Sequence, residues 1–157
     1  MKGDKSKDIR VLFSMLKGHH PHVLVITLIG HLLVEHIIDK IVITKSKYFD
    51  KKFKKLSFAE KVELTYPLWL PLHIYKNIKL LNRIRNDMAH NLHVRDYELT
   101  LFLDKGEKKV LHIPSGKDKN KFYLNYLVDT ILFELVNYSY YSLDISPEPD
   151  LVRIFNG

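Results

Sequence analysis

One long apolar stretch limits the folds open to this chain more than any other feature. It runs from Val23 to Ile43 and places apolar side chains on nearly every side of a helix. That pattern is typical of a helix buried at the centre of a domain. A polar stripe with a spacing of four residues lies along one face of the same helix. The stripe consists of Thr27, His31, Glu35 and Asp39. We therefore predict a central helix over about residues 21–44.

The same stretch is long enough to suggest a membrane span, but its polar residues argue against one. It contains His31, Glu35, His36, Asp39 and Lys40. A single Arg, Lys or Asp at the centre of a membrane costs about 2.5–3.5 kcal/mol on insertion scales. The residues before it do not form a secretory signal, because no apolar segment ends in a small-residue cleavage site. We expect no membrane contact.

Length and composition predict a single domain in the cytoplasm. The chain has 157 residues, of which 46% are hydrophobic, and this is enough for one core without disulfides or a structural metal. Cysteine is absent, which excludes thiolate chemistry and fits a reducing compartment. The formal net charge of +7 fits an RNA partner and a merely solvated basic surface equally well. We expect one domain over residues 1–157, with an irregular tail over 146–157.

Spacing and capping signals predict further helices on both sides of a basic connector. A short amphipathic helix is expected over residues 8–17. Ser57 and Glu60 have the spacing of a capping box, which opens a helix that should end before Pro67. Apolar residues then recur at intervals of three and four over residues 72–90, which predicts a longer amphipathic helix.

The last third of the chain mixes an ambiguous stretch with one more helix. Residues 99–113 fit two strands around a turn, although the first of these segments also fits a helix. An apolar helical pattern follows over about residues 122–141. The fold class is therefore all-α in the main. We predict a bundle of four or five helices, with a small β-hairpin between the last two as one reading.

The connector between the second and third helices is strongly basic. Its lysines either contact RNA phosphates or face solvent, and the sequence does not separate these two readings. Its aromatic residues, including Phe49 and Phe53, fit the core better than a base-stacking surface. The lysines that we consider as RNA-binding candidates are Lys51, Lys52, Lys54 and Lys55.

The end of the helix predicted over residues 72–90 carries the side chains with the clearest chemistry. Arg85 and Asn86 are followed by His90. A histidine can donate or accept a proton near neutral pH, and the planar guanidinium of arginine matches phosphate oxygens. A spacing of five places Arg85 and His90 about 140° apart around an ideal helix. Both reach one cleft only if the helix frays or if a second subunit completes the site. A capping and ion-pair arrangement would use the same residue types.

The segment Leu80–His90 resembles the signature of the HEPN family, which is an arginine, then a polar residue, then a histidine after four to six intervening positions. The segments 30–35 and 56–61 are similar to helices of the mannitol operon repressor group, whose fold resembles that of HEPN proteins. The resemblance covers about residues 23–92. It implies a helical bundle that forms a homodimer and, in many members, cuts RNA without a metal ion or other cofactor. Arg85, Asn86 and His90 match the catalytic positions.

The implied reaction is attack of the ribose 2′-hydroxyl on the neighbouring phosphate. DNA should therefore resist cleavage, and the products should end in a 2′,3′-cyclic phosphate. Such enzymes act as toxins or defence effectors, which implies an antitoxin or regulatory protein as a further partner. The alternative is a catalytically silent regulatory binding module like the mannitol operon repressor group. Glycine-rich phosphate loops, serine-nucleophile elbows and His-Glu-x-x-His motifs are missing from the sequence.

Two residues of the polar stripe are secondary candidates. His31 and Glu35 are four residues apart and could share a metal ion, but two ligands from one helix are a weak signal. A polar pair that satisfies itself inside a buried helix is the reading we favour. An intermediate reading is that His31 or Glu35 supports the cleft of Arg85 and His90 through hydrogen bonds. We expect no metal.

Overall fold

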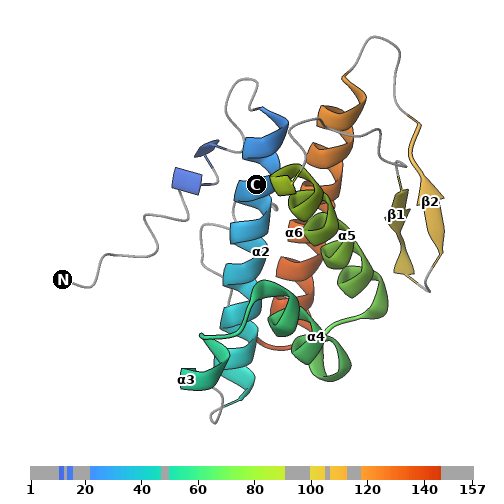
Figure 1. Ribbon diagram of the computed structural model, residues 1–157. Coiled ribbons are helices and arrows are strands. Elements are labelled where there is room, and N and C mark those ends of the chain that lie inside the picture. The colour runs from blue at the N-terminus through green and yellow to red at the C-terminus, as the bar shows by residue number, and fades with distance from the viewer. Residues whose placement is uncertain are drawn as a thin grey trace.

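The computed structural model describes residues 11–12, 14–15, 22–46, 50–90, 100–104, 107–112 and 118–145. In these ranges the chain forms four long helices, one single-turn helix and a two-stranded hairpin between the last two helices (Figure 1). The elements are α2 (Val23–Lys45), α3 (Asp50–Phe53), α4 (Phe58–Trp69), α5 (Leu72–His90), β1 (Thr100–Phe102), β2 (Lys108–Val110) and α6 (Lys119–Tyr141). The predicted fold class, a mainly helical bundle with a small hairpin, is confirmed.

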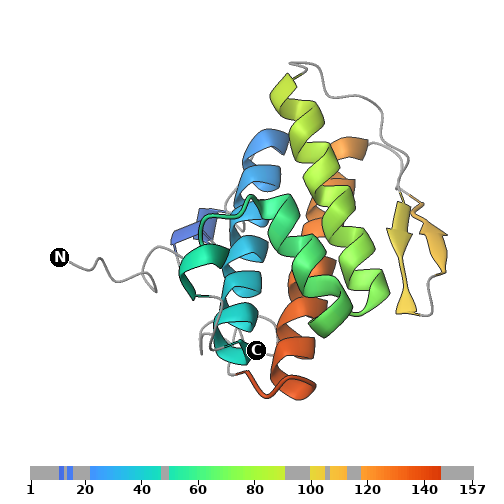
Figure 2. The ribbon, with the colours of Figure 1, turned by 60° about the horizontal axis from the view of Figure 1, so that its bottom comes forward.

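Helix α2 packs against α4, α5 and α6 (Figures 1 and 2). Most of its apolar residues are buried, as the sequence predicts, but Leu24, Leu28, Leu32 and Ile43 are exposed. Gly30 lies where α2 meets α6. A Cβ atom at this position would come within 2.6 Å of the Val128 Cγ2 atom. The glycine therefore permits the close approach of these two helices.

Helix α4 begins as predicted but ends later. The Ser57 Oγ accepts a hydrogen bond from the Glu60 amide, and the Ser57 amide donates to the Glu60 carboxylate at 2.7 Å, which completes the capping box. The prediction that this helix ends before Pro67 is wrong, because α4 continues to Trp69 with Pro67 inside it. The Tyr66 ring stacks on Tyr75 of α5 with ring centroids 4.0 Å apart. This packing offsets the backbone hydrogen bond that the proline removes.

The ambiguous stretch forms two antiparallel strands rather than a helix. Leu101 is paired with Lys109 at the centre of the ladder. Asn77 of α5 is fully buried and bonds both backbone groups of Phe102: it accepts from the amide and donates to the carbonyl, each at 2.9 Å. The Tyr123 hydroxyl of α6 donates to the Thr100 carbonyl at 2.9 Å. The hairpin is thus fixed to two helices.

Two smaller differences separate the predicted boundaries from the observed ones. Helix α6 starts at Lys119 rather than near Phe122, because Asp118 caps it by accepting a hydrogen bond from the Lys121 amide. The basic connector contains the helical turn α3, whose Phe53 is buried as expected.

The helix expected over 8–17 is described only at residues 11–12 and 14–15, which are helical. Phe49 and the tail over 146–157 lie outside the described residues. No helix in the described ranges has the length and apolar content needed to cross a membrane.

Candidate active site

Arg85, Asn86 and His90 lie in the last two turns of α5. The buried residues of this helix recur as predicted, and Ile84 and Met88 anchor its final turns in the core. Arg85 is half-buried, whereas Asn86 and His90 are exposed. The Arg85 Nη1 atom donates a hydrogen bond to the Asn86 Oδ1 atom at 3.2 Å. The amide therefore holds the guanidinium beside the exposed end of the helix.

His31 of α2 lies against the same part of α5. Its side chain is buried and its ring centroid is 3.9 Å from that of Phe58 in α4. Burial lowers the pKa of His31, the positive charge of Arg85 lowers it further, and Glu35 and a hydrogen bond with Asn82 oppose the shift. The imidazole is therefore neutral at neutral pH. Its Nε2 atom has no hydrogen-bond partner in the described part of the chain.

Glu35 and Asp39 are paired with a buried lysine of α4. The Lys61 Nζ atom lies 2.7 Å from a Glu35 oxygen and 2.9 Å from an Asp39 oxygen. Burial alone would lower the pKa of Lys61, but the hydrogen bonds and charges of the two carboxylates outweigh it and raise the pKa. Two carboxylates on a buried helix face require a cation. The sequence analysis did not identify Lys61, although the acidic stripe was the signal for it.

The residues of the polar stripe thus interact with two different helices, His31 with α5 and Glu35 with α4. His31 lies next to Arg85, while Glu35 is bound to Lys61. Within the described ranges, no three His, Cys, Asp or Glu side chains gather closely enough to hold a metal ion. His31 has a hydrogen bond with Asn82 of α5, one turn before the motif, and Glu35 pairs with Lys61.

The lysine candidates of the connector belong to α3 and the turn after it. Lys52, Lys54 and Lys55 are exposed. For Lys51 only the backbone position in α3 is described. This segment approaches the polar cluster from the side of Lys61, whose Nζ atom is 5.6 Å from the centre of the Phe53 ring. The described contacts do not bring these lysines to Arg85.

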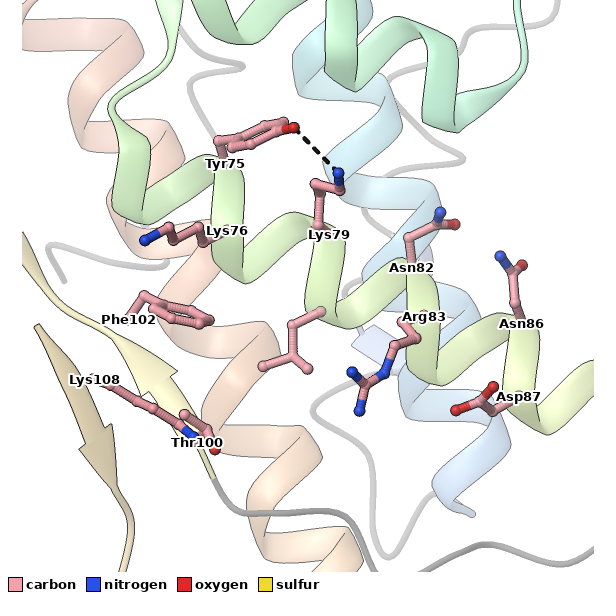
Figure 3. A pocket seen from close by; sticks show the side chains of 11 residues that line it. Tyr75, Lys76, Lys79, Asn82, Arg83, Asn86, Asp87, Thr100, Phe102 and Lys108 are labelled. Carbon is pink, nitrogen blue, oxygen red and sulfur yellow. Dashed lines mark hydrogen bonds between the residues drawn. The ribbon is translucent and has the colours of Figure 1, made fainter. Parts of the chain in front are cut away.

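A groove of about 830 Å³ runs between α5 and the hairpin (Figure 3). We call it the α5 groove. The sequence analysis did not predict this groove. The signal available in the sequence was the spacing of Lys76, Lys79 and Arg83 along the polar face of α5. Asn82 and Asn86 belong to its lining, so the groove adjoins the Arg85 site. The cationic and aromatic residues of the lining are Tyr75, Lys76, Lys79, Arg83, Phe102 and Lys108.

The site offers three groups of use in phosphate chemistry. They are a guanidinium held by an amide, an exposed imidazole at the end of α5, and a buried neutral imidazole. Comparisons of this chain with family models, curated proteins and solved structures find no match.

Proposed function

We propose that this protein is a metal-independent endoribonuclease of the HEPN type, with Arg85, Asn86 and His90 as its catalytic residues. The hydrogen bond of 3.2 Å between Arg85 and Asn86 carries the proposal, because it orients the guanidinium at the end of a helix that also exposes His90. A guanidinium oriented by Asn86 and an accessible imidazole at the end of the same helix would supply a phosphate ligand and a proton carrier.

The reaction uses the nucleophile that RNA itself contains. The ribose 2′-oxygen forms a bond to the adjacent phosphorus, the bond from phosphorus to the 5′-oxygen of the next nucleotide breaks, and a 2′,3′-cyclic phosphate and a 5′-hydroxyl result. One proton leaves the 2′-hydroxyl and one reaches the departing 5′-oxygen. His90 exchanges one of these protons. Arg85 binds the phosphate oxygens, whose negative charge increases in the transition state.

His31 acts in this scheme as a positioning residue. It is neutral and buried, and it lies close enough to Arg85 for the charge of the guanidinium to lower its pKa. A charged imidazole there would repel Arg85. The neutral state therefore lets α2 and α5 approach each other at the motif.

A second copy of the chain is part of the proposal. Arg85 and His90 point about 140° apart on one helix, so a cleft shared by two subunits would let each motif complete the other. Leu24, Leu28 and Leu32 form an exposed apolar stripe on α2, with exposed fractions of 41%, 41% and 48%. A homodimer contact there would cover this stripe. Light scattering on a size-exclusion column tests the dimer directly.

The decisive experiment incubates the wild type and His90→Ala with end-labelled single-stranded RNA in EDTA. We expect cleavage by the wild type, 2′,3′-cyclic phosphate ends, and at least a hundredfold slower cleavage by His90→Ala. His112→Ala is the matched control, because His112 is an exposed histidine at the end of the hairpin. It should cleave normally, and DNA of the same sequence should stay intact.

Failure of a folded, dimeric wild type to cleave RNA would refute the ribonuclease proposal. It would favour the silent regulatory module, which acts through protein partners. If cleavage is found, a role as a cytoplasmic toxin or defence effector predicts an antitoxin that binds over Arg85 and His90.

A further inference from the structure

The α5 groove has a rigid wall that the bundle itself supports. Phe102 lies in β1, and both of its backbone groups are bonded to Asn77 of α5 at 2.9 Å. Because Asn77 is fully buried, this pair of bonds is shielded from water. The backbone of Phe102 is therefore tied to α5, and its side chain lines the groove opposite that helix (Figure 3).

Positive charge dominates the lining of the groove. Lys76, Lys79 and Arg83 recur at intervals of three and four, so they lie on one face of α5, and Lys108 of β2 also belongs to the lining. Asp87 is the carboxylate among the lining residues. This balance favours a polyanion.

The lining cations are not equivalent. Lys79 is already engaged, since its Nζ atom lies 2.8 Å from Glu63 and donates to the Tyr75 hydroxyl at 3.2 Å. Within the described ranges, no carboxylate lies within ion-pair distance of Lys76 or Arg83. These two cations are therefore the ones best able to bind phosphate.

The groove also contains an aromatic surface. The Lys76 Nζ atom lies over the Phe102 ring, 5.1 Å from its centre. Phe102 is half-buried. A cation over a ring that water can still reach is held weakly, and stacking of a nucleobase on such a ring is stronger. A base can therefore replace Lys76 on Phe102, which frees the ammonium group to pair with the adjoining phosphate.

The groove leads to the proposed catalytic residues. Asn86 lines it and accepts the hydrogen bond from Arg85. From Lys76 to Asn86 the helix rises about 15 Å at 1.5 Å per residue. A strand that lies along the groove would thus reach the Arg85 guanidinium with its next nucleotides.

We propose that the α5 groove binds a single-stranded segment of the RNA substrate, with phosphates at Lys76 and Arg83 and a base stacked on Phe102. This inference rests on the proposed ribonuclease function. Paired bases in a duplex are already stacked on each other and present no free face to Phe102. The groove therefore selects unpaired RNA and presents it to Arg85.

The test measures binding of a labelled, unstructured RNA by fluorescence anisotropy, with all proteins in the His90→Ala background so that the RNA stays intact. Lys76→Ala/Arg83→Ala is expected to weaken binding at least tenfold. It should also reduce the slope of log affinity against log salt by about 1.4, because each phosphate neutralised on a single strand contributes about 0.7 to that slope. The matched control is Lys45→Ala/Lys119→Ala, which removes two exposed lysines at the end of α2 and the start of α6 and should weaken binding less than threefold.

A second pair of variants tests stacking without a change of charge. Phe102→Leu keeps an apolar side chain but removes the flat ring, and it should weaken binding about tenfold, the usual effect of removing one base stack. Phe133→Leu changes an exposed ring on α6 and should leave binding unchanged. Duplex RNA should bind the unaltered groove at least tenfold more weakly than the single strand.

Equal losses of affinity in the groove and control variants would overturn the proposal, because binding would then follow net charge alone. Equal affinity for duplex RNA or for polyglutamate would overturn it as well. Different outcomes would refute the proposed ribonuclease function. If the groove binds RNA but the enzyme with His90 intact cuts none, the proposed activity is wrong. If RNA is cut and the KM of the groove variants is unchanged, only the groove assignment is wrong.

Discussion

Gly30 of α2 lies so close to Val128 of α6 that a single added methyl group would come within 2.6 Å of the valine side chain. Val128 is fully buried and β-branched, so it cannot turn away freely. Overpacking of this kind costs about 1–3 kcal/mol, whereas replacing glycine by alanine in a helix gains up to about 1 kcal/mol. We expect Gly30→Ala to lower the free energy of unfolding by about 1–2 kcal/mol in urea denaturation.

The double variant Gly30→Ala/Val128→Ala supplies the control for this prediction. Removing the valine methyl groups makes room for the new one, so the double variant should be destabilised by less than the sum of the two single variants. Fully additive destabilisation would show that the contact is not the cause.

Replacing the buried Lys61 of α4 should lower the free energy of unfolding more than replacing Lys79, an exposed lysine that also pairs with a carboxylate. Lys61→Met leaves Glu35 and Asp39 without their cation, and their side chains are only 28% and 30% exposed. Breaking a buried ion pair costs about 3–5 kcal/mol, and the partial exposure of the carboxylates lowers our expectation to about 1–3 kcal/mol. Lys79→Met breaks a pair with Glu63 that is 53% exposed on both sides, and it should destabilise the protein much less than Lys61→Met, because solvent screens an exposed pair.

The destabilisation caused by Lys61→Met should shrink at strongly alkaline pH. Because the pKa of Lys61 is raised, the stability that its charge contributes is complete below the ordinary value of 10.5 and disappears only as the pH rises through the raised value. Urea denaturation at neutral pH and at a series of pH values above 10.5 measures the change. A destabilisation that stays constant over this range would contradict the ion-pair explanation.

Glu134 should make the bundle less stable as the pH rises towards neutrality. Burial, together with the charge of Asp104, raises the pKa of its carboxyl from 4.5 to about 7. Between these values the folded chain binds more protons than the unfolded chain, so the free energy of unfolding falls with rising pH. The expected fall is about 1–3 kcal/mol, since the side chain is a quarter exposed.

Glu134→Gln removes the ionisable group and should flatten this part of the pH profile. It should stabilise the protein at pH 8 and have little effect at pH 4.5, as measured by urea denaturation at each pH. A profile that keeps the same slope would assign the pH dependence to other groups.

We expect the planar shape of the Arg85 guanidinium, and not only its charge, to be needed for RNA cleavage. Arg85→Lys keeps a cation but loses the planar fork and the hydrogen bond to Asn86, so kcat for RNA cleavage should fall about a hundredfold. Arg83→Lys makes the same change in the groove, where a point charge still pairs with a phosphate, and should change kcat less than threefold. Equal reductions in kcat would show that Arg85 acts only through its charge.

Much of the fold follows from apolar spacing alone. The bounds of α5 agree with the prediction because its buried residues recur regularly up to the end of the helix. Pro67 misled the prediction for α4, since the stacking of Tyr66 on Tyr75 is a tertiary contact that local preference does not contain. The turn of α3 was missed for a similar reason, because its buried Phe53 depends on the neighbouring helices.

The site was only partly predictable. Arg85, Asn86 and His90 lie close together in sequence, and the stripe of α2 indicated that His31 could meet them. Lys61 and the α5 groove required knowledge of which helices pack together. The groove forms because Asn77 and Tyr123 hold the hairpin against the bundle. Asn77 bonds a residue 25 positions further along the chain, and no spacing rule predicts that pair.

The two hydrogen bonds from Asn77 also set how the hairpin moves. A strand of three residues would ordinarily open by itself and exchange its amide hydrogens quickly. The Phe102 amide, however, donates to a side chain buried inside α5. Its exchange should be slow and should follow the opening of the helical bundle, so this wall of the groove behaves as part of the core and not as a flap.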